Sequence, residues 1–182
     1  MKKNQLTTIK STAVILGKTK NIMNITKKIL EDSNKGLAKA KVSQDLSTHD
    51  GITIIGDLMW EKESKEMNWD DGMEYAKNLR LGGYDDWRLP TIEELLEIVI
   101  NCGGVASTWD DDNWEKITEN NISNEIYQTN YKAKGFMASN NYWSSSIYKV
   151  NSDNLWHLSF SYGRQYLNPE YFKYYVRCVR GG

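Results

Sequence analysis

Histidines and clustered carboxylates are the first residues to consider for chemistry, because they most often hold metal ions or move protons. His49 and His157 are the only histidines, and neither has a second strong ligand at the spacing that zinc sites use. Residues 109–114 bring three aspartates and an asparagine together, which could meet the demand of Ca²⁺ for oxygen ligands. This run lacks the alternating spacing of an EF-hand loop, and a solvated acidic loop explains it. We therefore expect no metal and no cofactor.

Nucleophilic side chains form no complete catalytic arrangement either. Residues 144–146 are three serines in a row, but no glycine elbow surrounds them and the nearby His157 has no evident acid to orient it. Cys102 and Cys178 are the only cysteines, and we expect them to be free and buried in a reducing compartment, with a disulfide between them as the alternative. The chain has no phosphate-binding glycine loop, and its basic residues are too dispersed to outline a nucleic-acid groove. We expect no catalytic residue and no nucleic-acid partner.

Polar aromatic and amide side chains gather near the C-terminus instead. Tyrosine, asparagine and arginine are enriched in contact surfaces, and aromatic faces with flanking amides also suit sugar rings. The alternative is that part of these residues fill core and strand positions. We predict that a protein or glycan ligand is bound by Tyr148, Asn151, Asn154, His157, Tyr162, Arg164 and Tyr166.

Composition is that of a chain with one domain and an appendage. With 182 residues it is long enough for one substantial core but not for two full domains. The net charge of −1, with acidic and basic residues interspersed, gives no global field that would favour nucleic acid or a polyanionic surface. The 11 tyrosines and 7 tryptophans outnumber the 3 phenylalanines, so most rings carry a polar group that suits half-buried positions.

The first 48 residues are predicted to form a helical segment, followed by one domain over residues 49–182. Ile15, Ile22 and Ile29 recur every seven residues in a lysine-rich stretch, which predicts an amphipathic helix over residues 9–30. Such a helix must cover its apolar stripe by docking on its own chain, by receiving a partner or by pairing into a homo-oligomer. The apolar run at residues 13–16 is too short for a signal peptide or a membrane span. We therefore expect a cytoplasmic location, with export by another route left open.

Local signals in the second part predict the elements that must position the contact residues. Thr91 lies three residues before Glu94, the spacing of a capping box, which predicts a helix over residues 91–100. A second helix is expected from Trp69, because apolar residues recur at helical spacing there. Alternating residues predict strands at 52–60 and between Trp143 and the C-terminus. Residues 101–141 are poor in periodic hydrophobics and are expected to be a long loop. The predicted fold is α+β, with two helices on a small twisted antiparallel sheet.

Three segments carry a resemblance to a known family. They are residues 82–91 (Gly-Gly-Tyr-Asp-Asp-Trp-Arg-Leu-Pro-Thr), residues 142–146 (Tyr-Trp-Ser-Ser-Ser) and residues 176–180 (Val-Arg-Cys-Val-Arg). In this order they resemble the domain at the C-terminal end of Legionella-type collagen-like adhesins, the Lcl C-terminal domain, over residues 57–182. The resemblance implies a C-type-lectin-like fold, shared with formylglycine-generating enzymes. Under this interpretation, the residues assigned to structure are Trp87, Arg88, Trp143 and Cys178.

The resemblance also implies what such a domain does. Members of this group usually recognise glycans or proteins, and variable proteins of diversity-generating retroelements have a similar fold. A non-catalytic recognition module is therefore the expected function. One alternative is a copper oxidase similar to the formylglycine-generating enzymes, although Cys102 and Cys178 do not match the cysteine positions of that family. The other alternative is a structural or assembly subunit organised by the N-terminal helix.

Overall fold

The computed structural model describes residues 51–138, 140–149 and 154–181. The chain divides into two compact units, Met1–Asp45 and Leu46–Gly182, and all described residues belong to the second. The predicted N-terminal helix, with the oligomerisation expected from it, lies outside the described residues. Among the described helices, none has the length and apolar character needed to cross a membrane.

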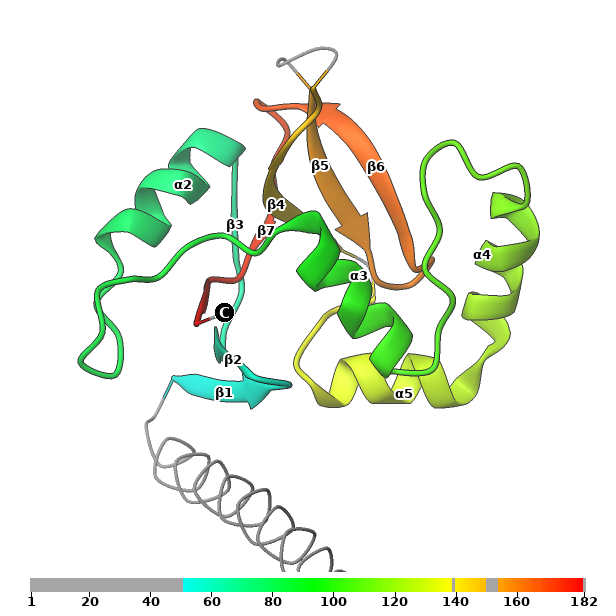
Figure 1. Ribbon diagram of the computed structural model, residues 1–182, viewed down its shortest axis with the longest axis horizontal. Coiled ribbons are helices and arrows are strands. Elements are labelled where there is room, and N and C mark those ends of the chain that lie inside the picture. The colour runs from blue at the N-terminus through cyan, green and yellow to red at the C-terminus, as the bar shows by residue number, and fades with distance from the viewer. Residues whose placement is uncertain (1–50, 139, 150–153, 182) are drawn as a thin grey trace, which may run out of the picture. The chain divides into compact units, whose positions relative to one another are not determined.

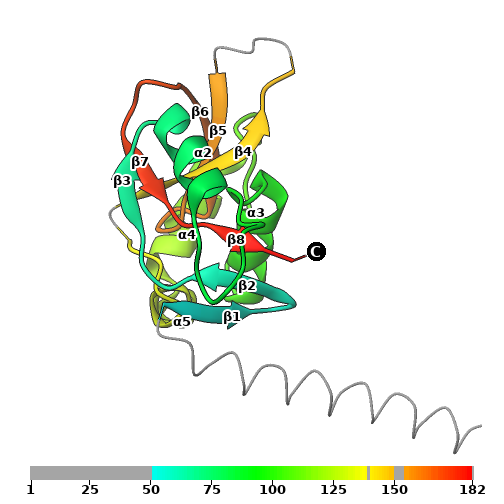
Figure 2. The ribbon, with the colours of Figure 1, turned by 90° about the vertical axis from the view of Figure 1, so that its left-hand side faces the viewer.

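A small antiparallel sheet joins the beginning of the domain to its C-terminal end. It has the order β1-β2-β8, with β1 at Ile52–Ile55, β2 at Leu58–Glu61 and β8 at Val179–Arg180. Figure 2 shows β8 alongside β2, with β1 on the outside. The strands at residues 52–60 were predicted from alternating residues, and both are confirmed.

A larger sheet carries the C-terminal strands that the sequence indicated. Its order is β3-β7-β4-β5-β6, and its strands are β3 (Lys65–Met67), β7 (Tyr174–Val176), β4 (Asn141–Ile147), β5 (Asn154–Ser159) and β6 (Arg164–Pro169). The prediction of a purely antiparallel sheet is wrong, because β4 and β7 run parallel where Tyr142 pairs with Tyr175. The α+β class is confirmed, with a mixed sheet.

Two of the four helices in the described residues were predicted. Helix α2 (Trp69–Asn78) begins at Asn68, whose side chain accepts a hydrogen bond from the Asp71 amide. Helix α3 (Ile92–Asn101) has the predicted capping box with Thr91. Both helices pack on the large sheet, α3 against β4, β5 and β6 and α2 against β4.

The other two helices lie in the segment predicted to be a loop, so that prediction is wrong. Helix α4 covers Trp114–Ser123 and α5 covers Glu125–Ala133, and Figure 1 shows both on the side of the domain opposite α2. The amide of Tyr127 donates to the Asn124 side chain, which caps α5. Polar residues fill most outward positions of the two helices, which hides their helical period. Tyr127 and Tyr131, four residues apart, are fully buried.

Aromatic rings dominate the first core, between α3, α5 and the large sheet. Phe136, Tyr142 and Phe160 contact one another at centroid distances of 4.2 to 5.4 Å. Tyr131 stacks on Phe160 at 5.8 Å, and Tyr127 donates its hydroxyl to the Phe160 carbonyl. Packed rings in this geometry contribute beyond their buried area, and they hold α5 in place.

The second core fills the opposite face of the large sheet, beneath α2. Trp143 is the neighbour of Tyr142 in β4, so its ring points to the other face, where it meets Trp87, Ala76 and Val176. The cysteines are divided between the cores, with Cys102 in the first and Cys178 in the second. Both are free and buried, as predicted, and burial raises the pKa of each thiol.

A buried arginine links three distant segments of the chain. Arg177 donates from Nε to the Glu61 carbonyl at 2.6 Å and from Nη1 to the Lys134 carbonyl at 2.8 Å. Its guanidinium lies 4.4 Å from the Phe136 ring centroid. Burial lowers the pKa of Arg177 to about 10, so it is charged at neutral pH. Strand β2, the end of α5 and the C-terminal strands are therefore held by one side chain.

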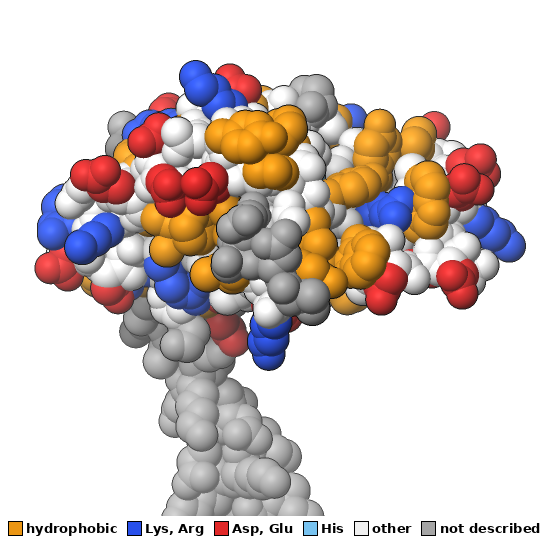
Figure 3. All heavy atoms as spheres, turned by 90° about the horizontal axis from the view of Figure 1, so that it is seen from above, with side chains coloured by type: hydrophobic (Ala, Val, Ile, Leu, Met, Phe, Trp, Pro, Cys, Tyr) orange, Lys and Arg blue, Asp and Glu red, His pale blue; other side chains and the backbone are white. Residues whose placement is uncertain are grey.

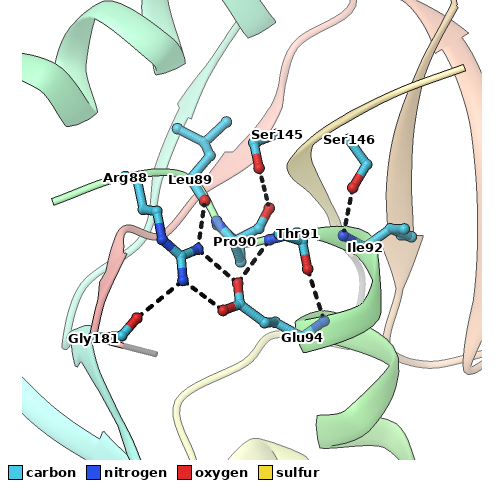
Figure 4. Close-up of polar contacts among 9 residues, drawn as sticks. All are labelled: Arg88, Leu89, Pro90, Thr91, Ile92, Glu94, Ser145, Ser146 and Gly181. Carbon is cyan, nitrogen blue, oxygen red and sulfur yellow. Dashed lines mark hydrogen bonds and ion pairs between the residues drawn. The ribbon is translucent and has the colours of Figure 1, made fainter.

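The start of α3 is held by a charged pair that continues the capping box. Arg88 donates to both carboxylate oxygens of Glu94, at 2.8 and 2.6 Å, and to the Gly181 carbonyl at 3.1 Å. Glu94 also accepts from the Thr91 amide at 2.8 Å, while its own amide donates to the Thr91 hydroxyl at 3.2 Å (Figure 4). One carboxylate thus connects the turn before α3, the helix itself and the C-terminus.

Two serines of β4 hold the same turn from the opposite side. The Ser145 amide donates to the Pro90 carbonyl at 2.7 Å. The Ser145 hydroxyl donates to the same carbonyl at 3.3 Å, and the Ile92 amide donates to the Ser146 hydroxyl at 3.0 Å (Figure 4). We name the set Arg88, Thr91, Glu94, Ser145 and Ser146 the capping node. The serine run therefore serves as a structural clamp between β4 and α3.

The capping node predicts a pH-dependent stability. Burial raises the pKa of Glu94, but the hydrogen bonds from Arg88 and Thr91 and the charge of Arg88 lower it by more. The folded pKa therefore lies below the unfolded value, and the stabilisation is present above about pH 4.3 and lost as the pH falls through the folded pKa. Because Arg88 is partly exposed, we expect Glu94→Gln to cost about 1 kcal/mol at neutral pH in urea unfolding.

The same measurement at low pH provides the test. The difference between wild type and Glu94→Gln should shrink between about pH 5 and pH 3, since the wild-type carboxyl becomes neutral there. Glu93→Gln, an exposed neighbour on α3, serves as the control and should show no such pH dependence. A Glu94→Gln penalty that is equal at both ends of this range would contradict the assigned charge pair.

Candidate ligand-binding surface

The predicted contact residues are carried mainly by the hairpin of β5 and β6. In this hairpin His157 pairs with Tyr166, and Ser159 pairs with Arg164. Because side chains alternate between the faces of a strand, all four point to the same face of the sheet. Strand β6 is the edge strand of the large sheet, so the side chains of this face lie next to the edge of the sheet.

Ring contacts form a continuous line across this face. Tyr171 stacks on Phe172 at 5.0 Å, and Phe172 lies 6.0 Å from Tyr174. His157 lies between Tyr174 and Tyr166, with centroid distances of 4.4 and 5.6 Å. We name this line the aromatic row, and together with its continuation at Arg164 it consists of Tyr171, Phe172, Tyr174, His157, Tyr166, Arg164 and Trp114.

Arg164 closes the row on the side of α4. Its guanidinium lies 5.1 Å from the Tyr166 ring centroid and 4.0 Å from that of Trp114, within the range of cation–π attraction. Its Nη2 donates to the Trp109 carbonyl at 2.9 Å. The side chain is therefore covered by rings and is only 8% exposed.

A second group of rings adjoins the row through this hydrogen bond. Tyr148 makes edge contacts with Trp109 at 6.3 Å and with Trp156 at 5.6 Å. We name these three residues the Trp109 cluster. Figure 3 shows hydrophobic side chains in several groups on this face of the molecule, with a basic side chain between two of them.

The loop that carries Trp109 is attached to the edge of β6. The Ser107 amide donates to the Gly163 carbonyl at 2.9 Å, and the Gln165 amide donates to the Ser107 carbonyl at 3.1 Å. These two bonds form a short parallel bridge with β6. The acidic loop after Ser107 is therefore anchored at its beginning, which brings Trp109 and Trp114 to the row.

Asn121 of α4 secures the turn between β5 and β6. It is buried, it accepts from the Val105 amide at 2.9 Å, and it donates to the carbonyls of Val105 and Tyr162, each at 2.8 Å. The turn needs glycine at Gly163, because φ is +66° there and an added Cβ would lie 2.4 Å from Asn121 Nδ2. The position of Tyr162 thus depends on an amide in a different element.

The predicted contact residues differ in their exposure. Tyr162 is exposed at 41%, and Tyr148, Asn154 and Tyr166 are half-buried. Asn151 lies outside the described residues. The expectation that these side chains face solvent is wrong for His157, which is 2% exposed, and for Arg164. His157 belongs to β5, which has neighbours on both sides, and Arg164 is covered by Trp114. Whether any of these residues contacts a ligand stays a prediction.

His157 has the environment of a packing residue. Neither ring nitrogen has a hydrogen-bond partner among the described residues, and the imidazole is surrounded by Trp143, Tyr166 and Tyr174. Burial lowers the pKa of His157 to about 3, so the ring is neutral at physiological pH. The neutral imidazole therefore forms the buried centre of the aromatic row, between Tyr166 and Tyr174.

Four exposed rings of this surface were missing from the predicted set: Trp109, Trp114, Tyr171 and Phe172. The two tryptophans flank the acidic run, which drew attention to its carboxylates and away from its rings. Their presence at the ends of a polar loop was the available signal, since large rings in such loops often mark contact sites. The described residues contain no group of three potential metal ligands close enough to share an ion.

The described residues thus define an α+β domain with an exposed aromatic surface held by ring contacts and a covered arginine. The family model of the Lcl C-terminal domain matches residues 54–180. The chain belongs to this family, which confirms the resemblance found in its sequence segments. No match to a curated protein was found.

The role of Asn121 predicts a specific loss of stability. Asn121→Ala removes three hydrogen bonds that a buried side chain makes to the backbone of Val105 and Tyr162, so we expect a loss of about 3 kcal/mol in urea unfolding. Asn120→Ala changes the exposed neighbouring amide and should cost less than about 0.5 kcal/mol. Equal effects of the two variants would contradict the role assigned to Asn121.

Proposed function

We propose that this domain is a non-catalytic recognition module that binds a protein or glycan ligand through the aromatic row, the Trp109 cluster and the exposed Tyr162 at the turn between β5 and β6. The observation that carries the proposal is the exposure of rings at both ends of a row whose centre is fixed. Tyr171 is exposed at 71%, while His157 in the middle is buried.

The energetics of the surface support this proposal. Tyr and Trp offer a large contact area at a low cost in conformational entropy, because each has only two side-chain torsions. Ring contacts from Tyr171 to Tyr166, and the cation–π contacts of Arg164 with Tyr166 and Trp114, restrict those torsions before a ligand arrives. Pre-organisation of this kind reduces the ordering cost of binding. The amide of Asn168 lies on the face of the aromatic row and donates to the Tyr174 hydroxyl, while Asn154 lies on the opposite face of the sheet.

Other features support the non-catalytic part of the proposal. His157 is a poor proton acceptor because burial lowers its pKa to about 3. The two cysteines belong to different cores, and burial raises the pKa of both thiols. A thiol held in its protonated form is a weak nucleophile and a weak metal ligand. These environments favour recognition over the copper oxidase alternative.

Two finer points belong to the same proposal. We infer a C-type-lectin-like fold from the family resemblance, with the α+β architecture as support. We also keep the possibility of a variable protein of a diversity-generating retroelement, since Tyr162 and Tyr171 are exposed and tyrosine is an expected outcome of adenine mutagenesis in asparagine codons. A reverse transcriptase gene beside a near-copy of the C-terminal coding segment would support it.

Binding to arrays of immobilised glycans and of purified proteins tests the proposal. We expect the full chain to bind at least one array member, and Tyr162→Ala and Tyr171→Ala to weaken that binding at least about tenfold, or about 1.4 kcal/mol. Because both side chains are exposed, the melting temperature should change by no more than about 2 °C.

An exposed apolar residue elsewhere provides the matched control. Ile126 on α5 is also 71% exposed, so Ile126→Ala removes a comparable surface side chain and should leave the affinity unchanged. The proposal is wrong if neither array yields a ligand. It is also wrong if Ile126→Ala weakens binding as much as the tyrosine variants do.

A further inference from the structure

A separate pocket lies between the β1–β2 turn and α3, and the proposed function makes no use of it. It has a volume of about 540 Å³, which is in the range of small-ligand sites. No residue of the aromatic row or the Trp109 cluster lines it. Apolar side chains form much of its wall, from Ile55, Leu58, Trp60 and Ile98.

The charged residues of this pocket all have the same sign. Asp57, Glu94 and Glu97 line it, and none of the described lining residues is a lysine or an arginine. Glu94 is neutralised by the two bonds from Arg88 in the capping node. Glu97, one helical turn later on α3, is exposed and makes no ion pair among the described residues. The rim therefore has an uncompensated negative charge on α3.

The inner wall is completed by the ring of Trp60. Trp60 is 1% exposed and makes an edge contact with Phe136 at a centroid distance of 5.6 Å. Its Nε1 is buried and has no hydrogen-bond partner among the described residues. Because this nitrogen has almost no accessible surface, Trp60 closes the wall as an apolar ring.

We propose that this pocket binds a short peptide segment that presents a lysine or arginine beside aliphatic side chains. The cationic group would lie at the rim against Glu97, and its alkyl stem would cover Leu58 and Ile55, because long basic side chains bury their stems while their charge stays near water. Aliphatic neighbours would fill the apolar wall. The Trp60 ring would close the inner end of that apolar wall.

Titration of the full chain with a capped tripeptide tests this assignment. The probe is acetyl-Leu-Lys-Leu-amide, and acetyl-Leu-Glu-Leu-amide is the charge-reversed comparison, with binding followed by NMR shift changes of the Trp60 indole. We expect the lysine peptide to bind with a Kd below about 10 mM and the glutamate peptide to bind at least about tenfold more weakly. The affinity of the lysine peptide should fall as salt is added.

A pair of variants on α3 separates this pocket from general charge attraction. Glu97→Lys reverses a charge that lines the pocket and should weaken the binding of the lysine peptide at least about tenfold. Glu93→Lys makes the same change in net charge on the same helix but outside the lining, and should change the affinity by less than about twofold.

Three results would overturn the proposal. The first is no binding of the lysine peptide in the tested range, and the second is equal weakening by Glu97→Lys and Glu93→Lys. The third is binding of lysine amide alone as tight as that of the tripeptide, which would assign the pocket to small amines and not to a peptide. Tyr171→Ala should leave the tripeptide affinity unchanged, so the test is independent of the aromatic row.

Discussion

The charged pair between Arg88 and Glu94 is the interaction on which the rest of the structure depends. A single carboxylate accepts from Arg88, completes the cap of α3 and, through Arg88, reaches the carbonyl of Gly181. The same turn is held by Ser145 of β4. The capping node therefore connects α3, the large sheet and Gly181. It fixes the position of β4, which pairs with the hairpin that carries the rings.

The sequence predicted those elements whose signals are local. The spacing of Thr91 and Glu94 located α3, because a capping box needs only four consecutive residues. Helices α4 and α5 escaped prediction because their sequence is polar on most sides and their buried positions are tyrosines and an asparagine. Tyr127 and Asn121 are buried through contacts with Phe160, Val105 and Tyr162, and contacts that distant in sequence leave no periodic pattern.

The candidate site was predictable in its location and less so in its members. Residue types alone indicated the C-terminal hairpin as the candidate contact region, since tyrosine and asparagine are concentrated there. They could not separate Tyr162, which reaches solvent, from His157, which occupies an inner strand. The contribution of Trp109 and Trp114 depends on the bridge of Ser107 to β6, a pairing between segments more than 50 residues apart that no local signal encodes.

The pairing of β2 with β8 has a consequence for biosynthesis. Met59 lies opposite Arg180, and Arg177 joins Glu61 to the segment after α5. Strand β2 is therefore synthesised early but can pair with β8 only after β8 has been made. While β8 is still inside the ribosome, β2 lacks this partner, and the cores lack Val179 and Cys178. The domain therefore completes its folding only after β8 has left the ribosome, as expected for a topology dominated by long-range contacts. A chaperone that shields nascent chains would find its substrate in this interval.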